Sequence, residues 1–239
     1  MGFDKETIEK IQELSLQAAG TCTINGRTYT AAQVRQVTDP RAEVMHVATL
    51  QAVVDYFNLD DRIIKEDTFI HVVDPTTVRL ISKLDPFQRD REVYIQAGAS
   101  TTGFMFGHSY AVAKFIVALR AGFVQGEAMD ALIKYTGNMK LDSSIRQQDD
   151  GVTQVITVKK GIDGEAWKAA PKDMLLAPWR TFVEVEQPES IFIFRAEEGR
   201  DGLITVSLHE VEDPHWQLVA IKRVAEWLKD ILPGVPIIA

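Results

Sequence analysis

Two places in the 239-residue chain carry the residue types that metal or ligand chemistry uses. At the first, Asp149 and Asp150 are adjacent, and paired carboxylates can hold a magnesium ion. Gly151 follows them directly, and an Asp-Gly turn that leads into a strand accounts for the same residues without a metal. The pair is therefore a candidate magnesium site, with a structural turn as its alternative.

At the second place, Arg180, Glu184 and Glu186 are two or four residues apart. The surrounding residues predict a strand over 179–185, and side chains at even spacing on a strand share one face. Arg195, in the strand predicted next, can pair with one of the two glutamates across the sheet. These charged residues predict either a face that binds a ligand or partner, or a ladder of structural ion pairs.

The remaining reactive side chains are scattered along the chain. None of the five histidines shows the paired spacing of a zinc-hydrolase helix, although His209 and His215 flank Glu210 at a candidate metal site or a solvated turn. The one cysteine, Cys22, excludes an intrachain disulfide and a Cys-rich zinc site. Residues 98–103 are small but lack the Gly-Lys-Ser/Thr ending of a phosphate-binding loop. The sequence therefore predicts no cofactor.

The elements that must position these residues follow from hydrophobic spacing and turn residues. Apolar residues at helical spacing predict helices over 4–19, 46–57, 109–123, 127–139 and from Asp213 onward. Alternating patterns predict a hairpin over 21–29 and strands over 68–74, 78–84, 92–97, 152–160, 179–185, 190–196 and 203–208. Because the strands come in runs, we expect an α+β fold with antiparallel sheets, an N-terminal helix, a central helix pair and a C-terminal helix. We expect a single domain over residues 1–239, with a candidate sub-domain boundary near 140–151.

The charge balance and the apolar segments restrict the partners. Acidic residues outnumber basic ones by 34 to 26, and the formal net charge of -8 argues against general binding to nucleic acid. Charged residues interrupt the first 20 positions, so the N-terminal segment does not resemble a signal peptide. The most apolar segment, 104–124, contains His108, Lys114 and Arg120, so we expect no membrane span. These features predict a cytoplasmic protein.

Several strings of the sequence resemble one family. They are residues 149–161, 176–188 with the pattern Arg-Thr-Phe…Glu-Val-Glu-Gln-Pro, and 191–195, with 71–80 and 115–119 upstream. Together they resemble the YfdQ-like family of phage and prophage proteins, a domain of unknown function, from about Ile24 to Leu232. The resemblance implies a phage- or prophage-encoded protein in a bacterial host cell. It brings no catalytic residues.

Three functions are consistent with these observations. The first is a non-enzymatic accessory protein that forms a homo-oligomer and binds a host or phage protein, for which tryptophans and an apolar tail offer interface material. The tail, residues 232–239, docks either on its own chain or on a neighbouring subunit. The second is a metal-dependent enzyme that acts on nucleotides or nucleic acid through Asp149, Asp150 and Glu184 or Glu186. The third is a shell- or ring-forming structural protein.

Overall fold

The structure is a computed structural model that describes residues 4–18, 21–24, 27–30, 41–59, 65–86, 89–139, 155–158, 166–169, 173–198, 203–211 and 214–239. The chain divides into two compact units, Met1–Arg41 and Ala42–Ala239, called the N-terminal and C-terminal units. The sub-domain boundary expected near 140–151 lies outside the described residues, and the division in the structure follows Arg41.

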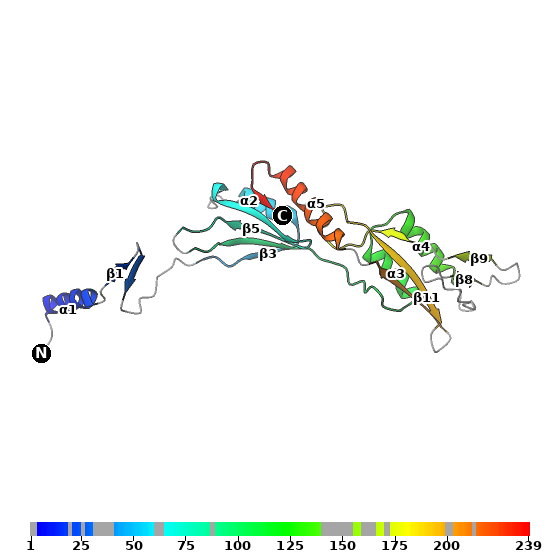
Figure 1. Ribbon diagram of the computed structural model, residues 1–239, viewed down its shortest axis with the longest axis horizontal. Coiled ribbons are helices and arrows are strands. Elements are labelled where there is room, and N and C mark those ends of the chain that lie inside the picture. Colours follow the sequence, from blue (N-terminus) through cyan, green and yellow to red (C-terminus); the bar gives the residue numbers. More distant parts are fainter. Residues whose placement is uncertain are drawn as a thin grey trace. The chain divides into compact units, whose positions relative to one another are not determined.

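The described residues of the N-terminal unit form a helix and a hairpin (Figure 1). Helix α1 (Lys5–Ala18) confirms the predicted N-terminal helix. It begins after Asp4, whose Oδ1 accepts hydrogen bonds from the Thr7 backbone nitrogen at 2.8 Å and from Thr7 Oγ1 at 2.7 Å. A carboxylate in this position satisfies N–H groups that have no partner inside the helix. Strands β1 (Thr21–Ile24) and β2 (Arg27–Thr30) pair antiparallel, which confirms the predicted hairpin.

The first sheet of the C-terminal unit has five strands in the order β13-β4-β5-β6-β3. In chain order they are β3 (Met45–Val47), β4 (Thr68–Asp74), β5 (Thr77–Ser82), β6 (Val93–Gly98) and β13 (Ile237–Ile238). The central three strands pair antiparallel, as the sequence predicted, and β3 and β13 join the edges in parallel. The short helix η1 (Lys65–Asp67) precedes β4.

The helix predicted over 46–57 is wrong at its start, because residues 46 and 47 belong to β3, which pairs with β6. Helix α2 (Leu50–Leu59) begins after Thr49. The Thr49 Oγ1 accepts a hydrogen bond from the Ala52 backbone nitrogen at 3.2 Å, so Thr49 caps the helix.

One face of the first sheet forms a hydrophobic core with α2 and α5 (His215–Ile231). Ile70 and Leu80 lie opposite each other on neighbouring strands, and paired residues of this kind share a face. Both are fully buried, as are Val224 and Leu228 of α5. Figure 1 shows α2 and α5 beside this sheet.

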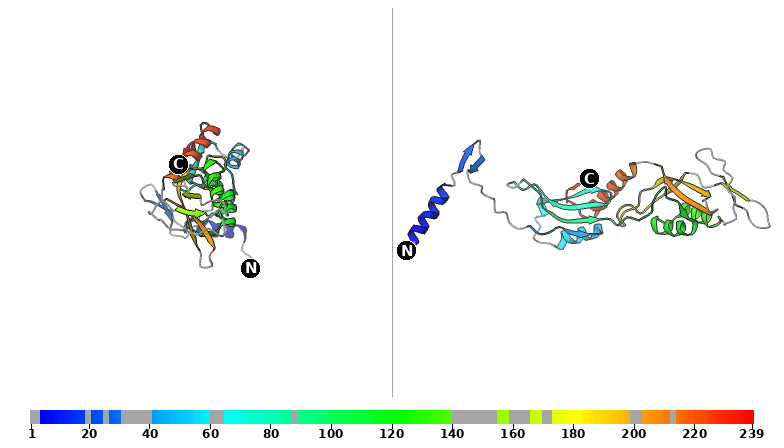
Figure 2. Two further views of the ribbon diagram at one scale, coloured as in Figure 1. Left: turned by 90° about the vertical axis from the view of Figure 1, so that its right-hand side faces the viewer. Right: turned by 90° about the horizontal axis from the view of Figure 1, so that it is seen from below.

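The second sheet has four strands in the order β10-β11-β12-β7. In chain order they are β7 (Tyr110–Ala111), β10 (Met174–Leu176), β11 (Ser190–Glu198) and β12 (Ile204–Glu210). Helices α3 (Val112–Gly122) and α4 (Glu127–Gly137) confirm the predicted central pair and pack on one face of this sheet (Figures 1 and 2). The second hydrophobic core lies between these two helices and the sheet. It is rich in aromatic rings, and the ring centroids of Phe115 and Phe194 are 5.9 Å apart.

Strands β8 (Val155–Val158) and β9 (Ala166–Ala169) form an antiparallel hairpin. Helices together with mainly antiparallel strands confirm the predicted α+β class. Among the described residues, no helix combines the length and the apolar character that crossing a bilayer requires.

The C-terminal tail docks on the sheet of its own chain. Strand β13 pairs in parallel with β4, which places Ile237 opposite Ile70. The Ile70 backbone nitrogen also donates a hydrogen bond to the Pro236 carbonyl at 2.9 Å. Of the two positions considered for the tail, the structure therefore shows the one on its own chain. Asp213, where the C-terminal helix was expected to begin, lies outside the described residues, and Pro214 directly precedes α5.

Candidate functional site

Residues 177–189, here called the clasp, connect β10 to β11 without regular secondary structure. The strand predicted over 179–185 is therefore wrong, and Arg180, Glu184 and Glu186 do not share a strand face. A turn replaces the strand, since the Val185 nitrogen donates to the Phe182 carbonyl at 3.3 Å. Alternating residue types predicted a strand, but the buried polar groups of this segment find partners outside a sheet.

Arg180 is the centre of the clasp, and only 8% of its surface is exposed. Its Nη1 donates a hydrogen bond to Glu210 Oε1 at 2.6 Å, and its Nη2 donates to the Pro188 carbonyl at 2.9 Å and to Ser190 Oγ at 2.7 Å. Its guanidinium carbon lies 4.1 Å from the centroid of the Trp216 ring, a cation–π contact. Arg180 thus joins the clasp to the end of β12 and the start of α5.

Burial lowers the pKa of Arg180, and the hydrogen bond and the negative charge of Glu210 oppose this shift. An arginine remains protonated at neutral pH even when its pKa is lowered. The buried cation is therefore balanced by Glu210, whose side chain is 20% exposed.

The Gln187 side chain forms the backbone hydrogen bonds of the clasp that a neighbouring strand would otherwise form. Its Oε1 accepts hydrogen bonds from the backbone nitrogens of Arg180 at 2.9 Å and Thr181 at 3.1 Å. Its Nε2 donates to the carbonyls of Phe182 at 2.9 Å and Val185 at 3.2 Å. Gln187 is 3% exposed, so one buried side chain satisfies four backbone groups of the turn.

Glu184 and Glu186 contact two different helices. Glu184 Oε1 accepts a hydrogen bond from the Gln51 nitrogen at 3.2 Å, in the first turn of α2, where a negative charge is favourable. Glu186 Oε2 lies 3.0 Å from Nη2 of Arg223 on α5, and the Glu186 side chain is 81% exposed. The two glutamates therefore fasten the clasp at two separate places.

The clasp also contacts the first hydrophobic core and the end of α3. Phe182 and Val185 are buried in the first core, and the Thr181 hydroxyl donates to the Pro75 carbonyl at the β4–β5 turn. On the other side, the Trp179 nitrogen donates to the carbonyl of Gly122, the last residue of α3, at 2.9 Å. Uncharged residues of the clasp thus also join separate elements of the C-terminal unit.

Two buried polar atoms of the clasp, Arg180 Nε and Glu184 Oε2, have no hydrogen-bond partner among the described residues. Each such atom costs about 1–3 kcal/mol relative to a bonded one. These atoms belong to residues that are already fastened to β12 and to α2, respectively.

Arg195, the fourth charged residue of the predicted site, does not belong to the clasp. It lies on β11 opposite Ser207 of β12, on the face of the second sheet that points away from the second core. Ser207 Oγ lies 3.0 Å from Nε2 of His209 on the same face. Asp149 and Asp150 lie outside the described residues. Within the described ranges, no three His, Cys, Asp or Glu side chains gather as metal ligands.

The same outer face carries an apolar group of residues that the sequence reasoning missed. Leu175, Ile191 and Val211 are 51%, 44% and 41% exposed, and half-buried Ile193 follows along β11. Leu175 and Ile191 are paired across the strands, and the Val211 nitrogen donates to the Ile191 carbonyl at 2.9 Å. These four residues are called the outer patch. The sequence indicates this patch by a run of four consecutive apolar residues, 191–194. Such a run makes a strand apolar on both faces, and a strand of this kind is usually covered on both.

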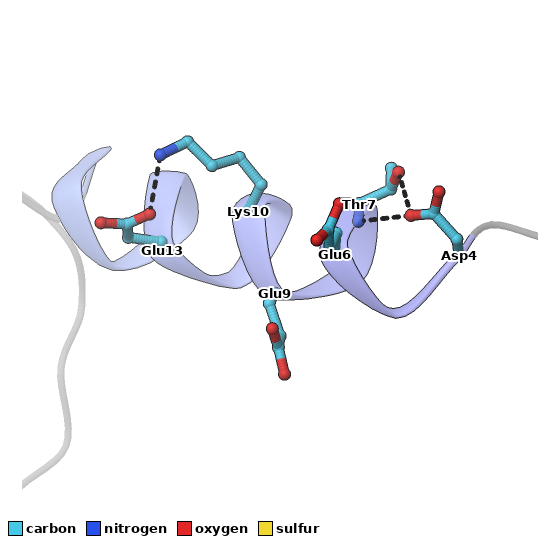
Figure 3. Close-up of a pocket in the computed structure, with 6 residues that line it drawn as sticks. All are labelled: Asp4, Glu6, Thr7, Glu9, Lys10 and Glu13. Carbon is cyan, nitrogen blue, oxygen red and sulfur yellow. Dashed lines mark hydrogen bonds and ion pairs between the residues drawn. The ribbon is translucent and has the colours of Figure 1, made fainter.

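An open hollow on α1 is lined by charged and polar side chains (Figure 3). Lys10 Nζ lies 2.9 Å from Glu13 Oε2, and Asp4 binds Thr7, so these groups are already paired within the helix. Comparison with protein-family models, curated proteins and solved structures finds no match for this chain.

Proposed function

We propose that this chain is a non-enzymatic accessory protein of a phage or prophage, which self-associates and binds a host or phage protein in the bacterial cytoplasm. The observation that carries the proposal is the outer patch, an uncharged apolar surface on the outer face of the second sheet. The resemblance to YfdQ-like proteins supports the phage origin.

In this proposal, a second copy of the chain covers the outer patch. Each chain has a formal charge of -8, so two copies repel each other over most of their surfaces. Leu175, Ile191, Ile193 and Val211 carry no charge, and the same patch on both copies fits a two-fold contact. The edge strands β7 and β10 have 2 and 3 residues, which is too short for association by strand addition.

The contacts of the clasp support a role in binding or assembly over a role in bond-making. Arg180 and Glu184 are directed to Glu210 and to the start of α2, respectively, and Glu186 pairs with Arg223. Three charged groups with three separate internal partners provide no common centre for a substrate.

The experiment is a mass measurement in solution over a range of concentrations. We expect the wild-type chain to exceed the mass of one chain, and Ile191→Asp to lower it. Leu218→Asp is the matched control, since Leu218 is an exposed apolar residue on α5 with 64% of its surface accessible. A wild-type chain that stays monomeric at every concentration would overturn the proposed self-association.

A thermal titration with magnesium, manganese and zinc tests the enzyme hypothesis directly. A metal that binds only the folded chain raises the unfolding midpoint. We expect no shift, and a shift abolished by Asp149→Asn with Asp150→Asn would contradict a non-enzymatic role.

A further inference from the structure

The face of the first sheet that points away from α2 and α5 carries a row of mainly polar side chains. The register of the strands places one residue of each strand side by side across the sheet, in the order Ile238, His71, Arg79, Gln96 and His46. Residues paired in this way share a face. The middle three are half-buried, and the outer two are exposed. These five residues are called the cross-strand row.

Arg79 lies at the centre of the row and has no acidic partner. Its Nε donates a hydrogen bond to Gln96 Oε1 at 2.7 Å, which leaves both Nη groups without a partner among the described residues. Arg180 and Arg223, by contrast, lie 2.6 Å and 3.0 Å from glutamate oxygens. The two Nη groups of a guanidinium form a fork that matches the two oxygens of a carboxylate. Gln96 therefore restricts the guanidinium of Arg79 and leaves the fork open.

A carboxylate on the same face, that of Asp74, is occupied at the β4–β5 turn. Asp74 is paired with Thr77, two residues before Arg79 on β5. Its Oδ1 accepts hydrogen bonds from the Thr76 backbone nitrogen at 2.7 Å and from Thr76 Oγ1 at 2.8 Å. Asp74 is thus bonded within its own turn, and the charge of Arg79 stays available to a ligand.

An apolar row lies beside the cross-strand row on the same face. Phe69, Ile81 and Val93 are paired in register across β4, β5 and β6. The guanidinium carbon of Arg91 lies 5.2 Å from the centroid of the Phe69 ring, so a second cation lies over this row. The face therefore combines two cations with an apolar strip, in a chain whose formal net charge is -8. An acidic ligand is repelled by most of such a chain and attracted to this face.

We propose that this face of the first sheet binds an acidic segment of a protein partner, and that the Nη groups of Arg79 bind one carboxylate of that segment. The inference rests on the proposed function, in which the chain binds a host or phage protein, and it names the chemistry of that partner. A nucleic acid fits less well, because its continuous phosphate backbone needs clustered Lys and Arg. His71 and His46 do not share a metal ion, because three strand spacings of about 4.8 Å separate them.

The first experiment measures the binding of a short fluorescent peptide to the full chain by anisotropy. The peptide carries Glu and Val in turn at every second position, with Ser between, so that both types face the sheet when the peptide is extended. We expect it to bind about tenfold or more tightly than the same peptide with Gln in place of Glu. Equal affinity for the two peptides, or no binding of either, would overturn the proposal. Tighter binding of an oligothymidine of equal charge would also overturn it, in favour of nucleic acid.

The second experiment repeats the titration with variants of the cross-strand row. Arg79→Gln should weaken binding of the Glu peptide about tenfold or more, because it removes the charge and the fork. Arg120→Gln is the matched control, since Arg120 is an exposed arginine of α3 and its loss changes the net charge equally. Gln96→Leu keeps the charge and removes the acceptor of Nε, so it should weaken binding by a smaller factor. Arg79→Gln that folds and binds as Arg120→Gln does would contradict the site.

The outcomes separate this inference from the proposed self-association. A chain that self-associates through Ile191 but binds neither peptide overturns the acidic partner and retains the self-association. A chain that binds the Glu peptide through Arg79 but stays monomeric supports the inference and overturns the self-association.

Discussion

The clasp and α1 use the same kinds of charged residues in opposite ways. In the clasp, Arg180 is 8% exposed and its guanidinium binds groups on β11, β12 and α5. In α1, Lys10 and Glu13 form an ion pair whose side chains are 68% and 56% exposed. A buried charge without its partner is costly, whereas an exposed pair contributes little to stability. Burial and bonding partners, and not residue type, therefore decide whether a charged side chain contributes to the stability of the fold.

The largest expected effect is at the centre of the clasp. Arg180→Ala should lower the free energy of unfolding by about 3–5 kcal/mol, because it leaves Glu210 without its partner in a mostly buried place. Urea denaturation measures this change. Arg223→Ala is the matched control, since its partner Glu186 is 81% exposed, and it should cost no more than about 1 kcal/mol.

Arg180→Lys separates the charge from the geometry of the guanidinium. Lysine keeps the positive charge but cannot reproduce the separate Nη1 and Nη2 donors to Glu210 and Ser190 together with the guanidinium contact on the Trp216 ring. We expect a loss in unfolding free energy between those of the wild type and of Arg180→Ala. A full rescue would show that the charge alone matters and would weaken the contrast with α1.

Gln187→Ala should have the next largest effect, about 2–3 kcal/mol, because it leaves buried backbone groups of the turn without partners. Gln125→Ala is a suitable control. Gln125 is exposed and also donates to main-chain carbonyls, those of Arg120 at 3.3 Å and Phe123 at 3.0 Å. Similar urea midpoints for the two variants would contradict the role assigned to Gln187.

Trp216→Leu tests the cation–π contact of the clasp. Leucine keeps apolar contact but removes the aromatic face, so we expect a loss of about 1–2 kcal/mol. The same substitution in an Arg180→Ala background should cost less, because the cation is already absent. Equal losses in the two backgrounds would show that Trp216 contributes only by packing.

The smallest effect is expected on α1. Lys10→Ala should change the free energy of unfolding by less than about 0.5 kcal/mol, since exposed helix pairs contribute this little. Raising the salt concentration should not change the result measurably. A loss as large as that of Gln187→Ala would show that α1 charges are structural, and the contrast between the regions would disappear.

The sequence predicted the regular elements well and the clasp poorly. Hydrophobic spacing located α3, α4 and the strands β4 and β11, because these elements bury one face, and it also located α1. The clasp also alternates residue types, but Gln187 supplies the hydrogen bonds that a neighbouring strand would have provided. A pattern of residue types cannot show that a side chain replaces a strand as the hydrogen-bond partner. It also cannot show that Arg180 binds Glu210, which lies 30 residues further along the chain.

The predicted site illustrates the same limit. Arg180, Glu184 and Glu186 do lie in one segment, yet each binds a different element, which spacing along the chain could not show. Arg195 lies on the outer face of the second sheet, opposite Ser207. Only the register of β11 and β12 determines this position.

The central claim is that the buried charge of Arg180 is bonded to Glu210 of β12 for structure. A double-mutant cycle with Arg180→Ala, Glu210→Ala and the double variant tests it most directly, by urea denaturation. We expect a coupling energy of about 2 kcal/mol or more, as groups in one hydrogen-bonded pair give. Losses that add to within about 0.5 kcal/mol would contradict the claim.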